Sequence, residues 1–309
     1  MPLISNPLWF AGGNGLPVGV SGSGLFAGGN NTYLFNITRL YSYSGYSTSP
    51  GTNLSSYVNY LAGAGNSSVG VFAGGESSAS STAPIGSLTS ASAVYTYSGN
   101  TVAAGTSLTT SLYQLAATGN QTLGIFGGGY HSAATAGTTT YTYTGNTSVA
   151  GTNLGTARQS LAATGSTTTG IFGGGLAGTY TAVTDQYTFS GASVVGGTAL
   201  TYAAQQLAAT TNPTTGFFGG GQTTGSFNAV SSYTYSGNTV HAGTNLGTAR
   251  YGLAATGNPT YGLFAGGFVT TYSSKTDIYV YASGTVVTNS SLGYAVEFLT
   301  ATSTSPGNL

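Results

Sequence analysis

The chain has 309 residues, of which only 3% are charged: four basic and four acidic residues give a net charge of zero. Nucleic acids and anionic lipids bind clustered Lys and Arg, so this composition excludes both as partners, and no apolar run approaches the ~20 residues that a membrane span needs. Cysteine is absent, which excludes thiolate catalysis and Cys-ligated zinc.

The first segment, 1–13, reads MPLISNPLWFAGG. It lacks the charged n-region and the continuous apolar stretch of a secretory signal. A surface wetted by hydroxyls and amides nevertheless suits an extracellular protein. We therefore expect an extracellular location that is reached by another route, for instance on a virion released by lysis.

Six close copies of one phrase follow, each a Gly-x-Phe that leads into a glycine pair. A repeat period of about 20–50 residues is typical of solenoids and propellers, in which each unit buries its apolar surface against its neighbours. The whole chain, 1–309, is therefore expected to be a single domain. The repeat phenylalanines are separated by 46, 54, 46, 46 and 46 residues: Phe26, Phe72, Phe126, Phe172, Phe218 and Phe264.

Each repeat contains four short segments with strand character. In the unit 161–200 they read LAATG, GIFGGG, DQYTFSG and SVVGGTAL, and each is bounded by turn-forming residues. Four strands in 46 residues predict a β-propeller blade. The blade units are 16–54, 61–108, 115–154, 161–200, 207–246 and 253–292.

The third segment of each unit carries a Tyr-x-Tyr pattern. Side chains alternate along a strand, so Tyr233 and Tyr235 point to the same face. We expect this aromatic face to pack against the neighbouring unit. The glycine pair after each Phe fits a close backbone approach or a positive φ angle.

A strand ending in Gly-Gly, a Tyr about twelve residues later and a unit near 50 residues resemble the kelch repeat. GIFGGG…TYTYTG and GLFAGG…DIYVYA are two instances. The resemblance covers nearly the whole chain and implies an all-β, six-bladed kelch-like β-propeller. Four valines stand near the place of the Trp that kelch repeats carry in the fourth strand: Val102, Val149, Val195 and Val240.

Half of the charged residues recur at equivalent repeat positions. Arg158 and Arg250 lie three residues before the first-strand leucine of their units, and Asp185 and Asp277 lie two residues before the first Tyr of the third strand. This pattern predicts two structural ion pairs, Arg158–Asp185 and Arg250–Asp277.

A possible ion pair with the two charges exchanged indicates how the ring closes. Arg39 stands at the Asp position of the first unit, and Glu297 lies two residues before Leu299 in the C-terminal segment. An Arg39–Glu297 pair would make this segment the first strand of the first unit. The termini, 1–13 and 297–309, would then close a ring of six blades.

An alternative has seven blades, one of them split and incomplete. In that arrangement 7–13 and 297–303 form a two-stranded blade, and 16–21 becomes the first strand of the first unit. The sequence leaves both arrangements open.

The sequence contains no recognisable catalytic constellation. Only His131 and His241 could act as bases near neutral pH, and they lie about two units apart. We therefore expect no enzymatic activity, no cofactor and no metal centre.

The residue after each glycine pair differs in all six units: Asn30, Glu76, Tyr130, Leu176, Gln222 and Phe268. Variation and insertion in repeat arrays collect in loops on one face, often the binding face, and the only insertion falls largely in 76–90. The candidate binding residues are therefore Glu76, Tyr130, His131 and Phe268. A tolerant surface loop is the alternative.

Two functions remain after these exclusions. The first is a structural or adhesive component of an extracellular assembly, such as a phage fibre or capsid decoration on a virion, that binds host glycans or partner subunits. The second is a free, secreted, lectin-like propeller.

Overall fold

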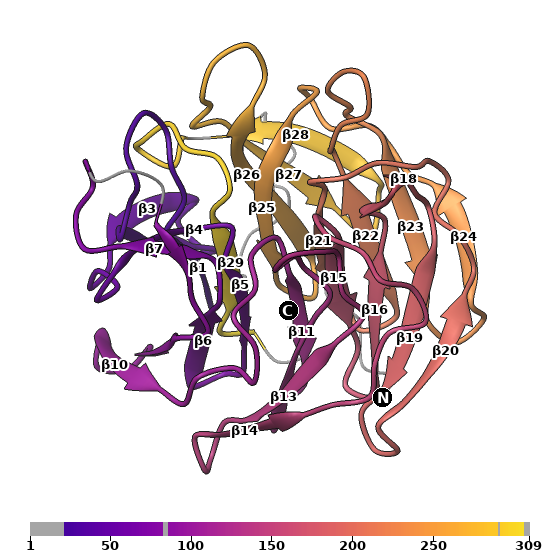
Figure 1. Cartoon of the computed structure of the whole chain (residues 1–309). Helices are drawn as coiled ribbons and strands as arrows, with labels where there is room; N and C mark the ends of the chain where they lie inside the picture. The colour runs from indigo at the N-terminus through magenta and orange to yellow at the C-terminus, as the bar shows by residue number, and fades with distance from the viewer. Residues whose placement is uncertain (1–21, 83–85, 290, 306–309) are drawn as a thin grey trace, which may run out of the picture.

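All regular elements in the described part of the chain are β-strands. The computed structural model describes residues 22–82, 86–289 and 291–305, and six four-stranded antiparallel sheets contain most of its strands. The sheets are arranged around a common axis like the blades of a propeller (Figure 1). Within the described residues, no helix is long and apolar enough to cross a membrane.

We number the sheets 1 to 6 and give their strands from the axis outward. Sheet 1 contains β29 (Thr300–Ser303), β1 (Ser23–Ala27), β2 (Thr38–Ser42) and β3 (Ser47–Pro50). Sheet 2 contains β5 (Ala62–Gly65), β6 (Val69–Ala73), β9 (Ser92–Thr96) and β10 (Thr101–Gly105). Sheet 3 contains β11 (Ala116–Gly119), β12 (Leu123–Gly127), β13 (Thr138–Thr142) and β14 (Thr147–Ala150).

Sheet 4 contains β15 (Ala162–Gly165), β16 (Thr169–Gly173), β19 (Thr184–Thr188) and β20 (Ser193–Gly197). Sheet 5 contains β21 (Ala208–Thr211), β22 (Thr215–Gly219), β23 (Val230–Thr234) and β24 (Thr239–Ala242). Sheet 6 contains β25 (Tyr251–Gly257), β26 (Tyr261–Phe268), β27 (Thr276–Val280) and β28 (Thr285–Asn289). Two small sheets contain β4 (Tyr57–Asn59), β7 (Glu76–Ser78) and β8 (Ser87–Leu88), and β17 (Leu176–Ala177) with β18 (Thr179–Tyr180).

Sheet 1 joins segments from opposite ends of the chain. β29 pairs antiparallel with β1, with Ala301 opposite Phe26. This agrees with the prediction that the C-terminal segment supplies the first strand of the first unit. The segments 1–13 and 16–21, on which the seven-blade alternative depends, lie outside the described residues.

The innermost strands of the six sheets lie side by side around the axis. They enclose a cavity of about 110 Å³, lined in each sheet by the first-strand leucine and the two residues that follow it, such as Leu161, Ala162 and Ala163. Small side chains on these strands keep a narrow channel open, while the outer strands are largely exposed.

A ring of six backbone hydrogen bonds closes the inner circle at one mouth of this channel. The residue just before each first-strand leucine donates its N–H to the C=O of the equivalent residue in the preceding sheet, at 2.7–3.1 Å. All six residues have left-handed φ angles of 53–63°. We call them the mouth ring: Tyr60, Gln114, Ser160, Gln206, Gly252 and Phe298.

The glycine pair of each repeat makes a second set of contacts between sheets. Gly220 and Gly221 have φ angles of 72° and 99°, and the Gly221 N–H donates to the Arg250 C=O at 2.8 Å. A Cβ added to Gly220 would lie 2.8 Å from that same carbonyl oxygen. Only glycine combines this backbone conformation with so close an approach.

The aromatic face of each sheet packs against its neighbour, as the sequence predicts. The second ring of the Tyr-x-Tyr pattern reaches a buried Thr on the innermost strand of the preceding sheet. Four such hydroxyl pairs form: Tyr43–Thr256 at 3.0 Å, Tyr97–Thr302 at 2.7 Å, Tyr235–Thr164 at 3.4 Å and Tyr281–Thr210 at 3.0 Å.

In each of the two remaining interfaces, one of the two hydroxyl groups of this pair is missing. At Gly170, Thr118 lies beside the ring of Phe189 instead of a tyrosine. At the equivalent Gly124, the Tyr143 hydroxyl lies beside Ala64 instead of a threonine. Thr118 Oγ1 and Tyr143 Oη are accordingly buried with no hydrogen-bond partner. An unsatisfied buried hydroxyl costs about 1–3 kcal/mol.

Restoring the missing partners should stabilise the protein. We expect Phe189→Tyr and Ala64→Thr each to raise the free energy of unfolding by about 1 kcal/mol, because each completes a hydroxyl pair that four other interfaces already have. Guanidinium unfolding measures this. Thr118→Val, which removes the unsatisfied hydroxyl instead, is the matched control and should also stabilise; a loss of stability in all three variants would contradict the assignment.

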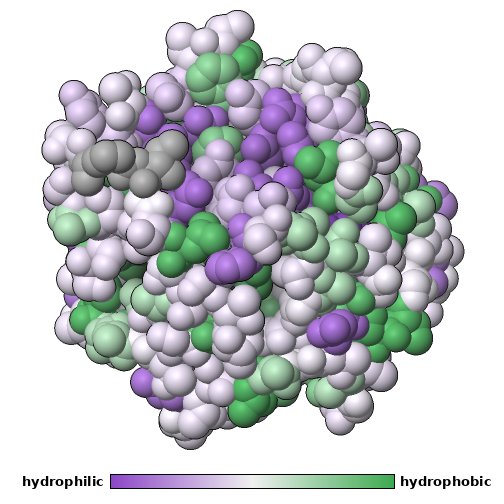
Figure 2. Space-filling view, viewed as in Figure 1, coloured by the Kyte–Doolittle hydropathy of each residue, from purple (hydrophilic) through white to green (hydrophobic). Residues whose placement is uncertain are grey.

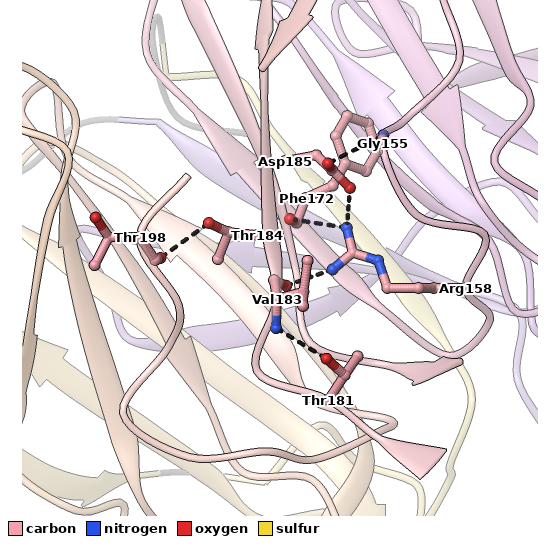
Figure 3. A network of polar contacts seen from close by, with 8 residues as sticks. All are labelled: Gly155, Arg158, Phe172, Thr181, Val183, Thr184, Asp185 and Thr198. Carbon is pink, nitrogen blue, oxygen red and sulfur yellow. Dashed lines mark hydrogen bonds and ion pairs between the residues drawn. The ribbon is translucent and has the colours of Figure 1, made fainter. Parts of the chain in front are cut away.

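Both predicted intra-sheet ion pairs are present and buried. The Nη2 atoms of Arg158 and Arg250 lie 2.5 Å from the Oδ2 atoms of Asp185 and Asp277, and both arginines are 0% exposed. Arg158 also donates to the backbone carbonyls of Phe172 and Val183, and the Gly155 N–H donates to Asp185 Oδ1 at 3.0 Å (Figure 3). The ion pairs thus connect the loop that precedes the innermost strand of a sheet to the second and third strands of the same sheet.

Other sheets fill the same space differently. In sheet 5, the Tyr202 hydroxyl lies within hydrogen-bond distance of the carbonyls equivalent to those that Arg158 contacts in sheet 4, with Ala229 O at 2.9 Å and Phe218 O at 3.3 Å as alternative acceptors of its one hydrogen. In sheet 3, Leu112 and Thr139 stand at the Arg and Asp positions. An ion pair is therefore one of several ways to fill this position.

Breaking a pair should cost more than replacing it. Asp185→Asn leaves a buried guanidinium without its carboxylate, and we expect a loss of about 3–5 kcal/mol in unfolding free energy. The double variant Arg158→Leu/Asp185→Thr copies the residues of sheet 3 and should recover most of that loss. A single variant that loses under about 1 kcal/mol would show that the pair contributes nothing measurable.

Candidate functional site at the channel mouth

The variable residues predicted as a binding face surround the mouth ring. Each pairs through its backbone with the residue two positions before the first-strand leucine of its own sheet: Asn30 with Glu297, Glu76 with Asn59, Tyr130 with Tyr113, Leu176 with Gln159, Gln222 with Gln205, and Phe268 with Tyr251. The inserted segment 76–90 adds β7 and β8, which extend this pairing beside β4. The structure thus brings the predicted positions together around one opening.

Tyr130 and Phe268 are half-buried, because each ring packs on a tyrosine of the paired position. The Tyr130 and Tyr113 centroids lie 5.6 Å apart, and those of Phe268 and Tyr251 lie 5.4 Å apart. His131 is exposed, with its Nδ1 3.1 Å from the Ser111 carbonyl oxygen.

Seven aromatic rings form a continuous arc around the mouth. Successive centroids are 4.0–6.4 Å apart, and the closest pair, Tyr60 and Phe298, is stacked at 4.0 Å. The arc spans sheets 3, 2, 1 and 6. In order, the aromatic arc is Tyr130, Tyr113, Tyr60, Phe298, Tyr251, Phe268 and Tyr272.

Two residues of the arc, Tyr60 and Phe298, hold a backbone conformation that bulky residues avoid. Both belong to the mouth ring and have φ angles of 53° and 54°. A left-handed φ costs a non-glycine residue roughly 1–2 kcal/mol, and Gly252 shows that glycine fits the same place. Large aromatic rings are therefore held here at an energetic cost, which is typical of functional positions.

Amides and a hydroxyl line the rest of the mouth. Gln114, Ser160 and Gln206 of the mouth ring line a cavity of about 80 Å³ together with the axial leucines. Gln222 Nε2 donates to Gln206 Oε1 at 2.6 Å. The opening is therefore aromatic on one side and polar but uncharged on the other.

Two carboxyl groups lie beside the arc. Burial raises the pKa of Glu297 to about 7, a shift that a hydrogen bond from Asn30 partly opposes, and burial also raises the pKa of Glu76. Burial first, and then the charges of Glu297 and Glu76, raise the pKa of Tyr60. Both acids therefore act on one ring at the centre of the arc.

The predicted Arg39–Glu297 ion pair is wrong. Among the described residues, ion pairs join only the two buried Arg–Asp couples. In sheet 4, the Arg158 carbonyl accepts a hydrogen bond from the glycine pair of the preceding sheet. In sheet 1, the equivalent acceptor is the Val296 carbonyl, so Glu297 lies one residue beyond the position that corresponds to Arg158. Adjacent side chains alternate in direction, and Arg39 lies over the Tyr294 ring instead, 5.5 Å from its centroid.

The sequence analysis missed five members of the arc: Tyr113, Tyr60, Phe298, Tyr251 and Tyr272. Four of them occupy the two positions before the first-strand leucine, where residue identity also changes from unit to unit. The same per-repeat variation that singled out the position after the glycine pair could therefore have found them.

No three His, Cys, Asp or Glu side chains lie together as a metal site in the part of the chain that the structure describes. Compared with known proteins, the sequence matches no protein-family model and no curated protein.

The raised pKa of Glu297 predicts a pH-dependent stability. An acid that binds its proton more tightly when folded makes stability fall as the pH rises from its unfolded pKa of 4.5 to its folded value of about 7. We expect Glu297→Gln to remove most of this fall and to exceed wild type by roughly 2 kcal/mol above neutral pH. Denaturant unfolding across this pH range tests it; equal pH profiles for both proteins would contradict it.

Proposed function

We propose that this chain is a six-bladed, kelch-like β-propeller that binds carbohydrate at its aromatic arc. It acts as a non-enzymatic adhesive component of an extracellular assembly, such as a phage fibre or a capsid decoration on a virion. Host surface glycans and neighbouring subunits are its partners.

The blade count is supported by the cyclic order of contacts. The mouth ring returns to its start after six hydrogen bonds, and the last of these joins Tyr60 to Phe298 of the C-terminal segment at 3.1 Å. The sheets and the period of the glycine pairs fit the kelch resemblance noted in the sequence.

The aromatic arc is the observation that carries the binding proposal. Aromatic rings offer flat apolar faces to the C–H faces of sugars, while tyrosine hydroxyls and amides hydrogen-bond their hydroxyls. The mouth combines both kinds of group, and the two strained aromatic residues lie at its centre. Most of the surface in Figure 2 has near-neutral hydropathy, and strongly hydrophilic residues gather in the upper centre of the view. Such a surface suits a polar partner.

Removing aromatic rings from the arc should weaken glycan binding. For Tyr130→Ala/Phe268→Ala we expect at least about a tenfold loss of affinity for the best ligand of a glycan array, because truncated aromatic anchors typically cost more than 1 kcal/mol each. Titration calorimetry gives the affinities, and a thermal melt establishes that the variant is folded.

The chain supplies a matched control. Leu176→Ala changes the same repeat position in sheet 4, away from the arc, and should keep the affinity within about twofold. Equal losses in both variants, or an array without any bound glycan, would refute the proposed site.

The place of the protein needs a separate measurement. Antibody labelling of particles from the native source should decorate a virion in electron micrographs. Recovery of the protein only in the soluble fraction would favour the free lectin-like propeller instead.

A further inference from the structure

The acids outside the buried ion pairs both lie at the channel mouth. Two of the four acidic residues bind the buried arginines, which leaves Glu76 and Glu297. Glu76 pairs through its backbone with Asn59, and Glu297 with Asn30. Asn59 Nδ2 donates to Asn30 Oδ1 at 3.0 Å, so the asparagines link the two acids in one row.

Both carboxyl groups act on the rings of the arc. Besides burial, Glu76 raises the pKa of Tyr60 and Tyr113, and Glu297 raises that of Tyr60 and Tyr251. Among the described residues neither acid forms an ion pair. This half of the mouth therefore combines two acidic side chains that form no ion pair with a row of aromatic rings.

Several buried oxygens at the mouth lack a hydrogen-bond donor. Glu297 Oε2, Asn59 Oδ1 and Ser160 Oγ belong to residues that are only 8%, 5% and 5% exposed. Gln114 Oε1 and Gln159 Oε1 are also without a partner, and Gln114 and Ser160 line the cavity. Buried acceptors are normally satisfied, so these unpaired oxygens add negative partial charge around the mouth, which favours a positively charged ligand.

We infer that the mouth selects an amine-bearing saccharide, whose ammonium group binds beside Glu76 and Glu297 against the face of the aromatic arc. An ammonium group supplies donors and positive charge together, and aromatic faces attract cations through their quadrupole. A neutral sugar would leave Glu76 and Glu297 without a counter-charge. This inference rests on the proposed carbohydrate-binding function and specifies its substrate class.

Two oligosaccharides distinguish the contribution of the amine to binding from that of the sugar ring. The glucosamine tetramer and the N-acetylglucosamine tetramer share one backbone, and acetylation removes the charge. By titration calorimetry at neutral pH and low salt, we expect the amine form to bind at least about tenfold more tightly. Added salt should reduce this preference and leave the neutral ligand largely unaffected.

The isosteric variant Glu76→Gln/Glu297→Gln tests the acids directly. It should lower the affinity for the amine form to about that for the acetylated tetramer and so abolish the preference, and a thermal melt establishes that it is folded. Equal affinities in wild type, or a preference that persists in the variant, would overturn the inference. If both tetramers bind equally and Tyr130→Ala/Phe268→Ala weakens both, carbohydrate binding stands without amine selection; if no saccharide binds, both are refuted.

Discussion

The structure depends on a cycle of backbone hydrogen bonds in which each sheet donates to the one before it. This cycle imposes a left-handed conformation on one residue of every sheet, whatever its side chain. Glycine meets the requirement without strain in sheet 6, whereas sheets 1 and 2 meet it with Phe298 and Tyr60. The same constraint that closes the ring therefore fixes the direction of the side chains at the mouth, and a rigid backbone presents a variable surface.

The backbone contacts between neighbouring sheets are the same around the ring, whereas the side-chain contacts differ from one sheet to the next. The space beside the second and third strands is filled by a buried ion pair in sheet 4, by the Tyr202 side chain in sheet 5 and by an aliphatic side chain in sheet 3. In all three sheets the hydrogen bond from the glycine pair of the preceding sheet is the same. The unpaired hydroxyls of Thr118 and Tyr143 mark interfaces where only one partner is present. Because each such contact is local, a change in one interface is expected to add to changes in the others.

The repeat made much of the fold predictable, since strand alternation, glycine pairs and matched charges each have a direct structural meaning. Arg158–Asp185 followed from spacing alone, because both residues recur at one position in two sheets. Arg39–Glu297 failed because a shift of one residue reverses the direction of a side chain. The arc was only partly predicted, since the prediction followed the position after the glycine pair, whereas Tyr60 and Phe298 occupy the equally variable position before the first-strand leucine.

The pairing of β29 with β1 has a consequence for synthesis and folding. β29 follows every other described strand in sequence, so in a nascent chain β1 lacks this partner until β29 has left the ribosome. Exposed edges invite pairing with other chains, and contacts over such sequence separations form slowly. A chaperone that shields this edge until β29 is made is therefore expected to raise the yield of folded protein.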